Sequence, residues 1–159
     1  MIKPRTKARY IALQALYEYD LSGHTPTRII QDRLEEETVS PFLEKFANNI
    51  VQGIIPIIMQ IDDLISQHAP EWPLDQVAVI DRNIIPIALW EFAIAGCTPV
   101  KVAINEAIEL AKLFGSDSSP RFVNGVLGSL ANRKNEIRQR FHPTSDSISP
   151  TVFDEPFQE

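Results

Sequence analysis

The side chains best suited to chemistry in this chain are four cations close to its start. Lys3, Arg5, Lys7 and Arg9 alternate with neutral residues, and no acid occurs among the first nine positions. Cations in such a run neutralise the phosphates of nucleic acids. If the run continues into a helix, Arg5 and Arg9 share one side of it. A solvated basic terminus is an equally good interpretation of this segment taken alone.

A second polar group, GSDSSPRF, occupies residues 115–122. It leads into a predicted helix, whose first N–H groups and dipole favour an anion. Arg121 adds a cation, although ordinary helix capping explains these residues more simply. Tyr17 and Phe122 can stack on unpaired bases, as in single-stranded RNA recognition, but aromatic residues on helices more often pack in cores.

Enzyme signatures are not found in the sequence. His24, His68 and His142 are scattered, with no acid or cysteine at the spacing of metal ligands, so we expect no metal and no cofactor. Glu106 and Glu109 lie on one predicted helical face, which is better explained by solvation than by acid–base catalysis. We therefore expect a binding protein rather than an enzyme.

Composition places the chain among globular proteins. It has 159 residues, 44% hydrophobic and 23% charged, with a net charge of -6. Its apolar runs are too short for the ~20 residues that cross a bilayer, and its start lacks the pattern of a signal peptide, so no membrane association is expected. A single cysteine, Cys97, excludes an internal disulfide and favours a cytoplasmic location.

Apolar residues recur at three- and four-residue spacing through most of the chain, which predicts an all-α fold. Gly23, Gly96 and Gly115 are predicted helix ends, and Pro56 predicts a kink near residues 52–56. Gly125 and Gly128 lie in a helical stripe, where close helix contact would explain them. The predicted helices cover residues 7–21, 26–37, 40–65, 78–95, 98–115 and 118–130, within a total of about seven.

The segment 69–74, APEWPL, carries two prolines and is predicted to link two helical halves. We expect one domain over residues 1–141, with halves at about 1–68 and 75–141. Residues 142–159 are acidic and rich in serine and proline, and we expect them to be disordered.

Three segments resemble the NusB family of transcription antitermination factors. The most specific is TPVKVAINEAIELAKLFGSDSSPRFVNGVL at 98–127; ARYIALQALYEYDLSG at 8–23 and VIDRNIIPIALWEF at 79–92 are similar to its opening and fifth helices. The resemblance extends over residues 5–137. It implies two small packed three-helix bundles that bind the boxA RNA of ribosomal RNA leader transcripts together with NusE, a small-subunit ribosomal protein. It also implies a place in the RNA polymerase antitermination complex, which promotes processive rRNA transcription without catalysing a reaction.

The resemblance implies roles for individual residues. Its RNA-binding positions correspond to Lys3, Arg5, Lys7, Arg9, Tyr17, Lys101, Gly115, Ser116, Asp117, Ser118, Ser119, Arg121 and Phe122. Its NusE-binding positions correspond to Asp75, Asp81 and Glu91. Family members occur as monomers and dimers, so a homodimer stays open.

The chain departs from the family pattern at three places, one of which is the acidic tail beyond the family's core, and two other functions stay open. Its basic arm alternates with neutral residues where the family shows consecutive arginines, and Pro86 replaces a residue that is commonly arginine. One alternative is a helical adaptor that binds only protein. The other is the RNA-binding module of an rRNA methyltransferase, for which this chain lacks room for an S-adenosylmethionine domain.

Overall fold

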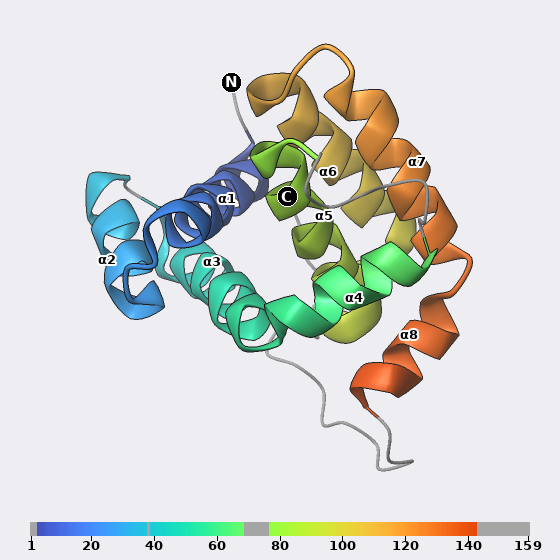
Figure 1. Cartoon of the computed structure of the whole chain (residues 1–159). Helices are drawn as coiled ribbons and strands as arrows, with labels where there is room; N and C mark the ends of the chain where they lie inside the picture. The colour runs from blue at the N-terminus through green and yellow to red at the C-terminus, as the bar shows by residue number, and fades with distance from the viewer. Residues whose placement is uncertain (1–2, 38, 69–76, 143–159) are drawn as a thin grey trace.

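The structure is a computed structural model that describes residues 3–37, 39–68 and 77–142. These residues form helices and no strand, which confirms the predicted all-α class (Figure 1). The helices are α1 (Pro4–Ser22), α2 (Pro26–Glu36), α3 (Pro41–Ile54), the short 3₁₀ turn η1 (Ile55–Ile57), α4 (Ile58–His68), α5 (Val79–Leu89), the π-helical turn η3 (Trp90–Ile94), α6 (Val100–Phe114), α7 (Ser119–Ala131) and α8 (Lys134–Phe141).

The first bundle is built by α1, α2 and α3. The fully buried residues of α1 repeat at helical spacing, as Ala8, Ile11 and Ala12 show, and they face α2 and α3. Gly23 ends α1 in the left-handed conformation, with φ of 69°, and donates its N–H to the Tyr19 carbonyl at 3.0 Å. The predicted end of this helix is confirmed.

The predicted kink is confirmed at Pro56. The proline lies in η1, which divides one predicted helix over 40–65 into α3 and α4. Proline has no N–H to donate to the preceding turn, so the axis changes direction there (Figure 1). After the kink, α4 leaves the first bundle and packs against α7.

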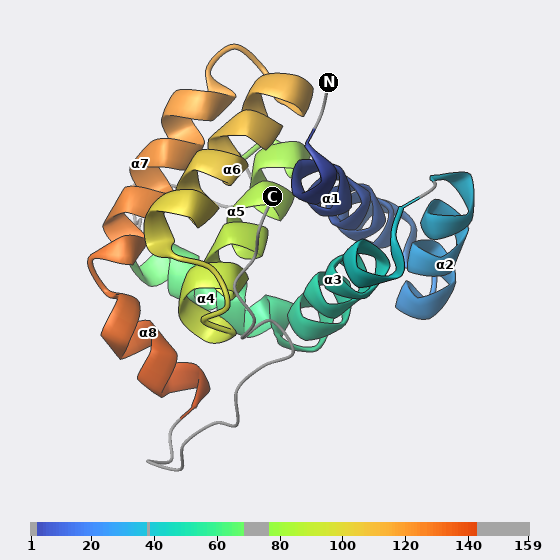
Figure 2. The same ribbon diagram turned by 180° about the vertical axis from the view of Figure 1, so that it is seen from behind.

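The second bundle is built by α5, α6 and α7. Ile84, Leu89 and Phe92 from the continuous α5–η3 segment are fully buried among them. The two bundles are joined through contacts of α1 with α5 and α6, so they share one core (Figures 1 and 2). The predicted pair of packed bundles is confirmed.

Three predictions about details were wrong or incomplete. Thr98 does not cap α6, because Pro99 occupies that position and the Thr98 hydroxyl bonds Glu91 instead. A Cβ at Gly125 or Gly128 meets no atom of the described residues within 4 Å, so close helix packing does not explain these glycines. We also did not predict α8, although Ile137 and Phe141 have the required i, i+4 spacing.

The predicted linker at 69–74 lies outside the described residues. So does the predicted disordered tail, 142–159, except for His142, whose Nε2 lies 2.7 Å from the Ile94 carbonyl oxygen.

Candidate nucleic-acid interface

The start of α1 and the loop between α6 and α7 lie at the same end of the molecule (Figures 1 and 2). Two aromatic rings hold them together. Tyr10 of α1 stacks on Phe114, the last residue of α6, with ring centroids 4.4 Å apart and an angle of 6° between the planes. The contact places the basic arm beside the helix that leads directly into Gly115.

A groove of about 840 Å³ runs between the arm and α6. Lys3, just before α1, and Thr6 of α1 line one side of it, and Lys112 and Leu113 line it from α6. Asn105, Glu106, Ile108 and Glu109 complete the lining. The groove therefore combines two cations and an apolar surface with two carboxylates, and Lys112 lies 3.4 Å from Glu109. Lys3 and Arg121 are both exposed, as phosphate-binding cations must be.

The loop before α7 is organised by its own hydroxyl groups. The fully buried Ser119 accepts a hydrogen bond from the Ser116 N–H at 2.9 Å, and its Oγ lies 3.2 Å from that of Ser116. A Cβ at Gly115 would lie 2.5 Å from Ser119 Oγ, so this position requires glycine for space. Ser116, Asp117 and Ser118 are exposed. Ser119 therefore shapes the loop from inside, while the other three residues face solvent.

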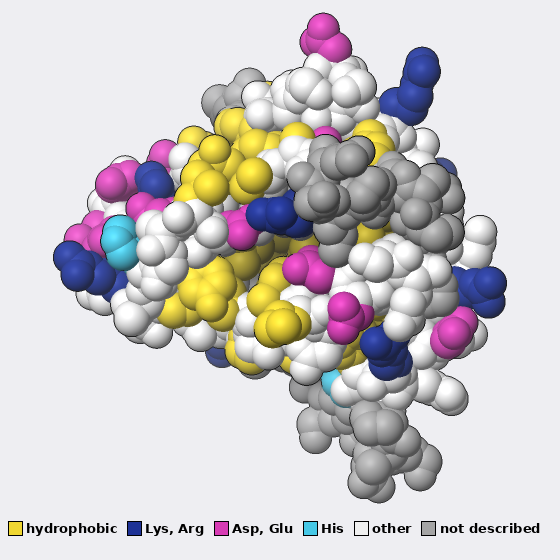
Figure 3. Space-filling view, viewed as in Figure 1, with side chains coloured by type: hydrophobic (Ala, Val, Ile, Leu, Met, Phe, Trp, Pro, Cys, Tyr) yellow, Lys and Arg dark blue, Asp and Glu magenta, His cyan; other side chains and the backbone are white. Residues whose placement is uncertain are grey.

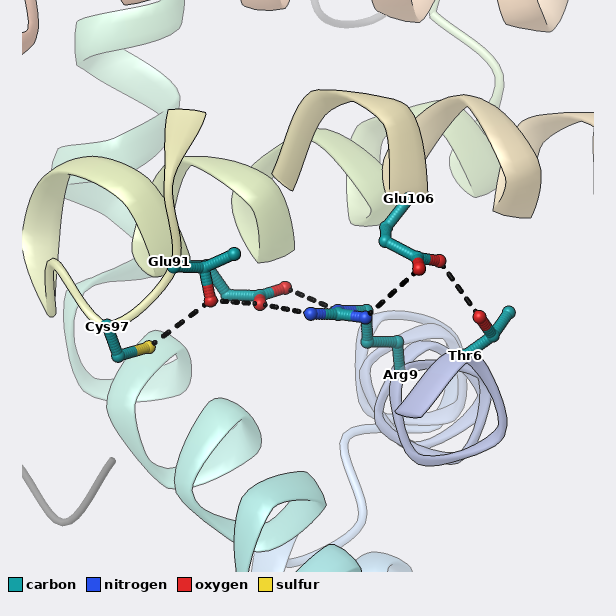
Figure 4. Close-up of polar contacts among 6 residues, drawn as sticks. Thr6, Arg9, Glu91, Cys97 and Glu106 are labelled. Atoms are coloured by element: carbon teal, nitrogen blue, oxygen red, sulfur yellow. Dashed lines mark hydrogen bonds and ion pairs between the residues drawn. The ribbon is translucent and has the colours of Figure 1, made fainter. Parts of the chain in front are cut away.

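Arg9 lies in the interior, where it joins the two bundles. It is 1% exposed and donates to Glu91 through Nε at 2.9 Å and Nη2 at 2.8 Å. Its Nη1 lies 3.6 Å from Glu106, which also accepts a hydrogen bond from Thr6 at 2.9 Å (Figure 4). The guanidinium carbon lies 5.2 Å from the ring centre of Phe46. In this arrangement the charge of Arg9 is balanced by carboxylates of α6 and η3, rather than presented to a ligand.

Arg5 also lies inside, at 8% exposed. The apolar spacing of α1 distinguishes these two buried arginines from the lysines. Arg5 lies three residues before Ala8 and Arg9 three before Ala12, within the stripe that faces the core. Lys3, in contrast, lies before the helix and is exposed. If charge is considered without this stripe, all four cations are assigned to one exposed surface. That assignment is wrong for Arg5 and Arg9, which are buried.

The other predicted RNA-binding residues do not form one cluster. Lys7 is half-buried and pairs with Glu37 at 3.2 Å, on the side of α2. Lys101 begins α6 and so lies about 20 Å along the helix axis from Gly115. Tyr17 and Phe122 are half-buried, and Tyr17 lies near the far end of α1 from the arm.

Two predicted partner-binding carboxylates are buried, and the third, Asp75, lies outside the described residues. Glu91 is 1% exposed and is bound by Arg9 and by the Thr98 hydroxyl at 2.8 Å. Asp81 is 5% exposed at the start of α5. Burial raises its pKa, and a hydrogen bond with Ser119 offsets part of the rise. Neither carboxylate is presented to a partner in this structure.

Comparisons with known proteins identify the family of this chain and its fold. The sequence model of the NusB family matches residues 6–132. The chain belongs to the NusB family. The transcription antitermination protein NusB of Roseiflexus sp. (strain RS-1) is 44% identical over 141 residues, which cover 87% of this chain and 99% of that protein. The NusB of Bacillus subtilis (strain 168) is 44% identical over 135 residues, 85% of this chain and 98% of that protein.

Solved structures of the family have the same fold. T. maritima NusB superposes with a TM-score of 0.77 at 32% identity, covering 86% of this chain and 98% of that one. A chain from a crystal structure of the antitermination factors NusB and NusE in complex with dsRNA gives a TM-score of 0.72 at 23% identity, covering 88% and 99%. The second likeness shows the NusB fold alone.

Membership in the NusB family confirms the expectation of a transcription factor rather than an enzyme, because the matching relatives are transcription antitermination proteins. Within the described part of the chain, no three His, Cys, Asp or Glu residues are placed to hold a metal ion. Nor does any helix there have the length and apolarity to cross a membrane.

Proposed function

We propose that this chain is a transcription antitermination factor that binds RNA through the end of the molecule where α1 meets the α6–α7 loop. Membership in the NusB family carries the proposal, since its relatives are named for this activity. Lys3, Arg121 and the exposed loop residues Ser116, Asp117 and Ser118 form the contact surface. Arg9 supports it from inside by fixing α1 against the second bundle.

The RNA we propose is the boxA element of ribosomal RNA leader transcripts, bound together with NusE within the RNA polymerase antitermination complex. Support comes from the structure that contains NusB, NusE and dsRNA, whose NusB-like chain shares this fold. The exposed Ser and Asp residues of the loop and the half-buried Phe122 that follows them suit single-stranded RNA, which proteins recognise through hydrogen bonds and stacking. A cytoplasmic location belongs to the same proposal.

The test is fluorescence anisotropy of a labelled boxA-like RNA and a scrambled RNA, titrated with the protein alone and with its cognate NusE at two salt concentrations. We expect preference for boxA, tighter binding with NusE, and affinity that falls as salt rises. The variant Lys3→Gln/Arg121→Gln should weaken binding several-fold. The matched control Arg28→Gln/Lys45→Gln removes two exposed cations of α2 and α3 and should leave binding unchanged.

Two results would contradict the proposal. If neither preparation distinguishes the two RNAs while NusE still binds, the chain is a protein-binding adaptor. If the control variant weakens binding as much as the Lys3/Arg121 variant does, net charge rather than this surface governs the affinity.

A further inference from the structure

A second basic surface lies at the other end of α7, on α8 and the connection that precedes it. Residues 133–141 contain Arg133, Lys134, Arg138 and Arg140 with Glu136 as the single acid. Dark-blue side chains are visible over this part of the molecule in Figure 3. The NusB family model ends at Asn132, so this surface follows the family-matched region. Nothing in the proposed RNA contact uses it.

The surface contains a hollow of about 450 Å³ whose lining has no carboxylate. Gln67 of α4 lines it together with Ser129, Asn132 and Arg133 from the end of α7 and the turn after it. All four side chains carry hydrogen-bond donors. Arg133 also lines an adjoining hollow of about 470 Å³, formed by residues 131–136. The guanidinium therefore lies between two hollows, with uncharged donors on one side.

A second guanidinium is fixed at the edge of the first hollow. Arg140 donates from Nη1 to Gln67 Oε1 at 2.8 Å, which ties the end of α8 to α4. Because the Gln67 oxygen accepts this bond, its amide nitrogen is turned the other way and can donate. Arg133 has one ion pair with an acid, to Glu136 at 3.6 Å, and both side chains are about 60% exposed. Such an exposed pair is weak and gives way to a stronger anion.

We propose that this hollow binds a phosphate of the RNA backbone, as a second contact on the same RNA that reaches the α6–α7 loop. Two guanidinium groups and three uncharged donors match the requirements of a phosphodiester, which accepts hydrogen bonds and carries a single negative charge. The inference rests on the proposed function, because it assumes that the chain binds RNA.

The separation of the two contacts sets the length of RNA required. The loop precedes the first residue of α7 and the hollow lies at its last turn. Thirteen helical residues span about 20 Å. At about 3.4 Å per stacked nucleotide, roughly six nucleotides connect the two contacts. RNA confined to the first contact therefore cannot reach the second.

The experiment compares two RNAs in anisotropy titrations, one of about 4 nucleotides, which is too short to connect the contacts, and one of about 24 that contains the same segment. For Arg133→Gln/Arg140→Gln we expect about three- to tenfold weaker binding of the long RNA, with the short RNA unaffected. The slope of log affinity against log salt should become shallower by about 0.7 for each phosphate that the variant no longer neutralises. Arg28→Gln/Lys45→Gln is the control of equal charge.

Two further variants distinguish weaker phosphate binding from a damaged fold. Arg133→Lys/Arg140→Lys keeps both charges and should restore most of the binding of the long RNA. Ser129→Glu places a negative charge in the hollow without removing a cation, and it should weaken the long RNA selectively. Circular dichroism melts of each variant should match the unaltered protein.

The outcomes distinguish this inference from the proposed function. If the unaltered protein binds neither RNA, both fail. Suppose instead that the unaltered protein binds boxA-like RNA. If Arg133→Gln/Arg140→Gln then binds the long RNA as tightly as the unaltered protein does, with the same salt slope, only the second contact is overturned. Because a phosphate-binding hollow also accepts inorganic phosphate, we expect inorganic phosphate at matched ionic strength to displace the long RNA better than chloride does. Selective displacement that persists equally with the short RNA would contradict the second contact.

Discussion

At the scale of single residues, the buried Arg9 determines how the two bundles are held together. Its guanidinium donates two hydrogen bonds to Glu91 and lies near Glu106. These two carboxylates of the second bundle therefore contact one cation of the first. A buried charge is tolerated only while its partners stay in place. The neighbouring Cys97 lies in the same region, and burial raises the pKa of its thiol to about 11, so it is uncharged at neutral pH.

Removing one carboxylate that binds Arg9 should strongly destabilise the fold. We expect Glu91→Ala to lower the free energy of unfolding by about 3 to 5 kcal/mol, because Arg9 would stay buried without its main counter-charge. The control Glu109→Ala removes the exposed carboxylate beside Lys112 and should cost less than about 0.5 kcal/mol. Urea unfolding followed by circular dichroism measures both. Equal effects of the two substitutions would show that the buried pair has no special role.

A second residue, Asp62, makes the free energy of unfolding depend on pH. Burial raises the pKa of Asp62 from 3.8 to about 6, and the nearby carboxylates of Asp20 and Asp63 add to the rise, while Arg82 opposes it. The folded state therefore binds more protons than the unfolded state between these two values. The contribution of Asp62 to the free energy of unfolding is accordingly lost as the pH rises from about 4 to 6.

Asp62→Asn removes this dependence. Relative to the unaltered protein, the variant should gain about 1 kcal/mol of stability between pH 4 and pH 7, a modest value because the carboxyl is only partly buried. Urea unfolding at the two pH values measures the gain, with Asp32→Asn on the exposed face of α2 as the control. A constant difference between variant and parent at both pH values would rule out this role for Asp62.

At the scale of elements, two helical glycines differ in how closely other side chains approach them. Gly53 of α3 faces the indole of Trp90, whose Cε2 would lie 2.7 Å from an added Cβ. The glycine therefore lets α3 approach η3 closely, which a side chain would prevent. Gly125 of α7 is exposed, and an added Cβ meets no atom of the described residues within 4 Å. Only the first position needs glycine for packing.

Alanine at the two positions should therefore have effects of opposite sign. Gly53→Ala is expected to destabilise the fold by about 1 to 3 kcal/mol, because Trp90 must move within a packed core. Gly125→Ala is expected to stabilise it by about 0.5 to 1 kcal/mol through higher helix propensity. Thermal and urea unfolding of both variants give the comparison. Destabilisation by Gly125→Ala would mean that α7 has a neighbour that the described residues do not include.

At the scale of the whole molecule, the two bundles share a core through α1, α5 and α6 and through the Arg9 ion pairs. We propose that residues 1–141 form a single cooperative domain with two halves, as the sequence predicts. Trp90 of η3 lies against Gly53 of α3, so its fluorescence reports on the contact between the two bundles, whereas circular dichroism reports on the helices of both halves.

Urea unfolding should then give coincident transitions by the two methods. Trp72→Phe leaves Trp90 as the sole tryptophan, which restricts the fluorescence signal to the contact between the bundles. Two separate transitions would contradict the single domain and would indicate that the halves fold independently. Glu91→Ala removes the ion pair that joins the two bundles, so it should separate the two transitions more than Glu109→Ala does. The same assay measures this separation.

Local sequence is sufficient to predict the helical class, the ends of α1 at Gly23 and of η3 near Gly96, the kink at Pro56 and the family. These features depend on local periodicity and on backbone chemistry, which neighbouring residues carry. The partners of the buried Arg9, by contrast, depend on the tertiary structure. Arg9 and Lys3 have the same charge and lie six positions apart, but Arg9 meets Glu91, 82 positions along the chain, while Lys3 is exposed. A contact between residues so distant in sequence leaves no local pattern, because it depends on how separate helices pack.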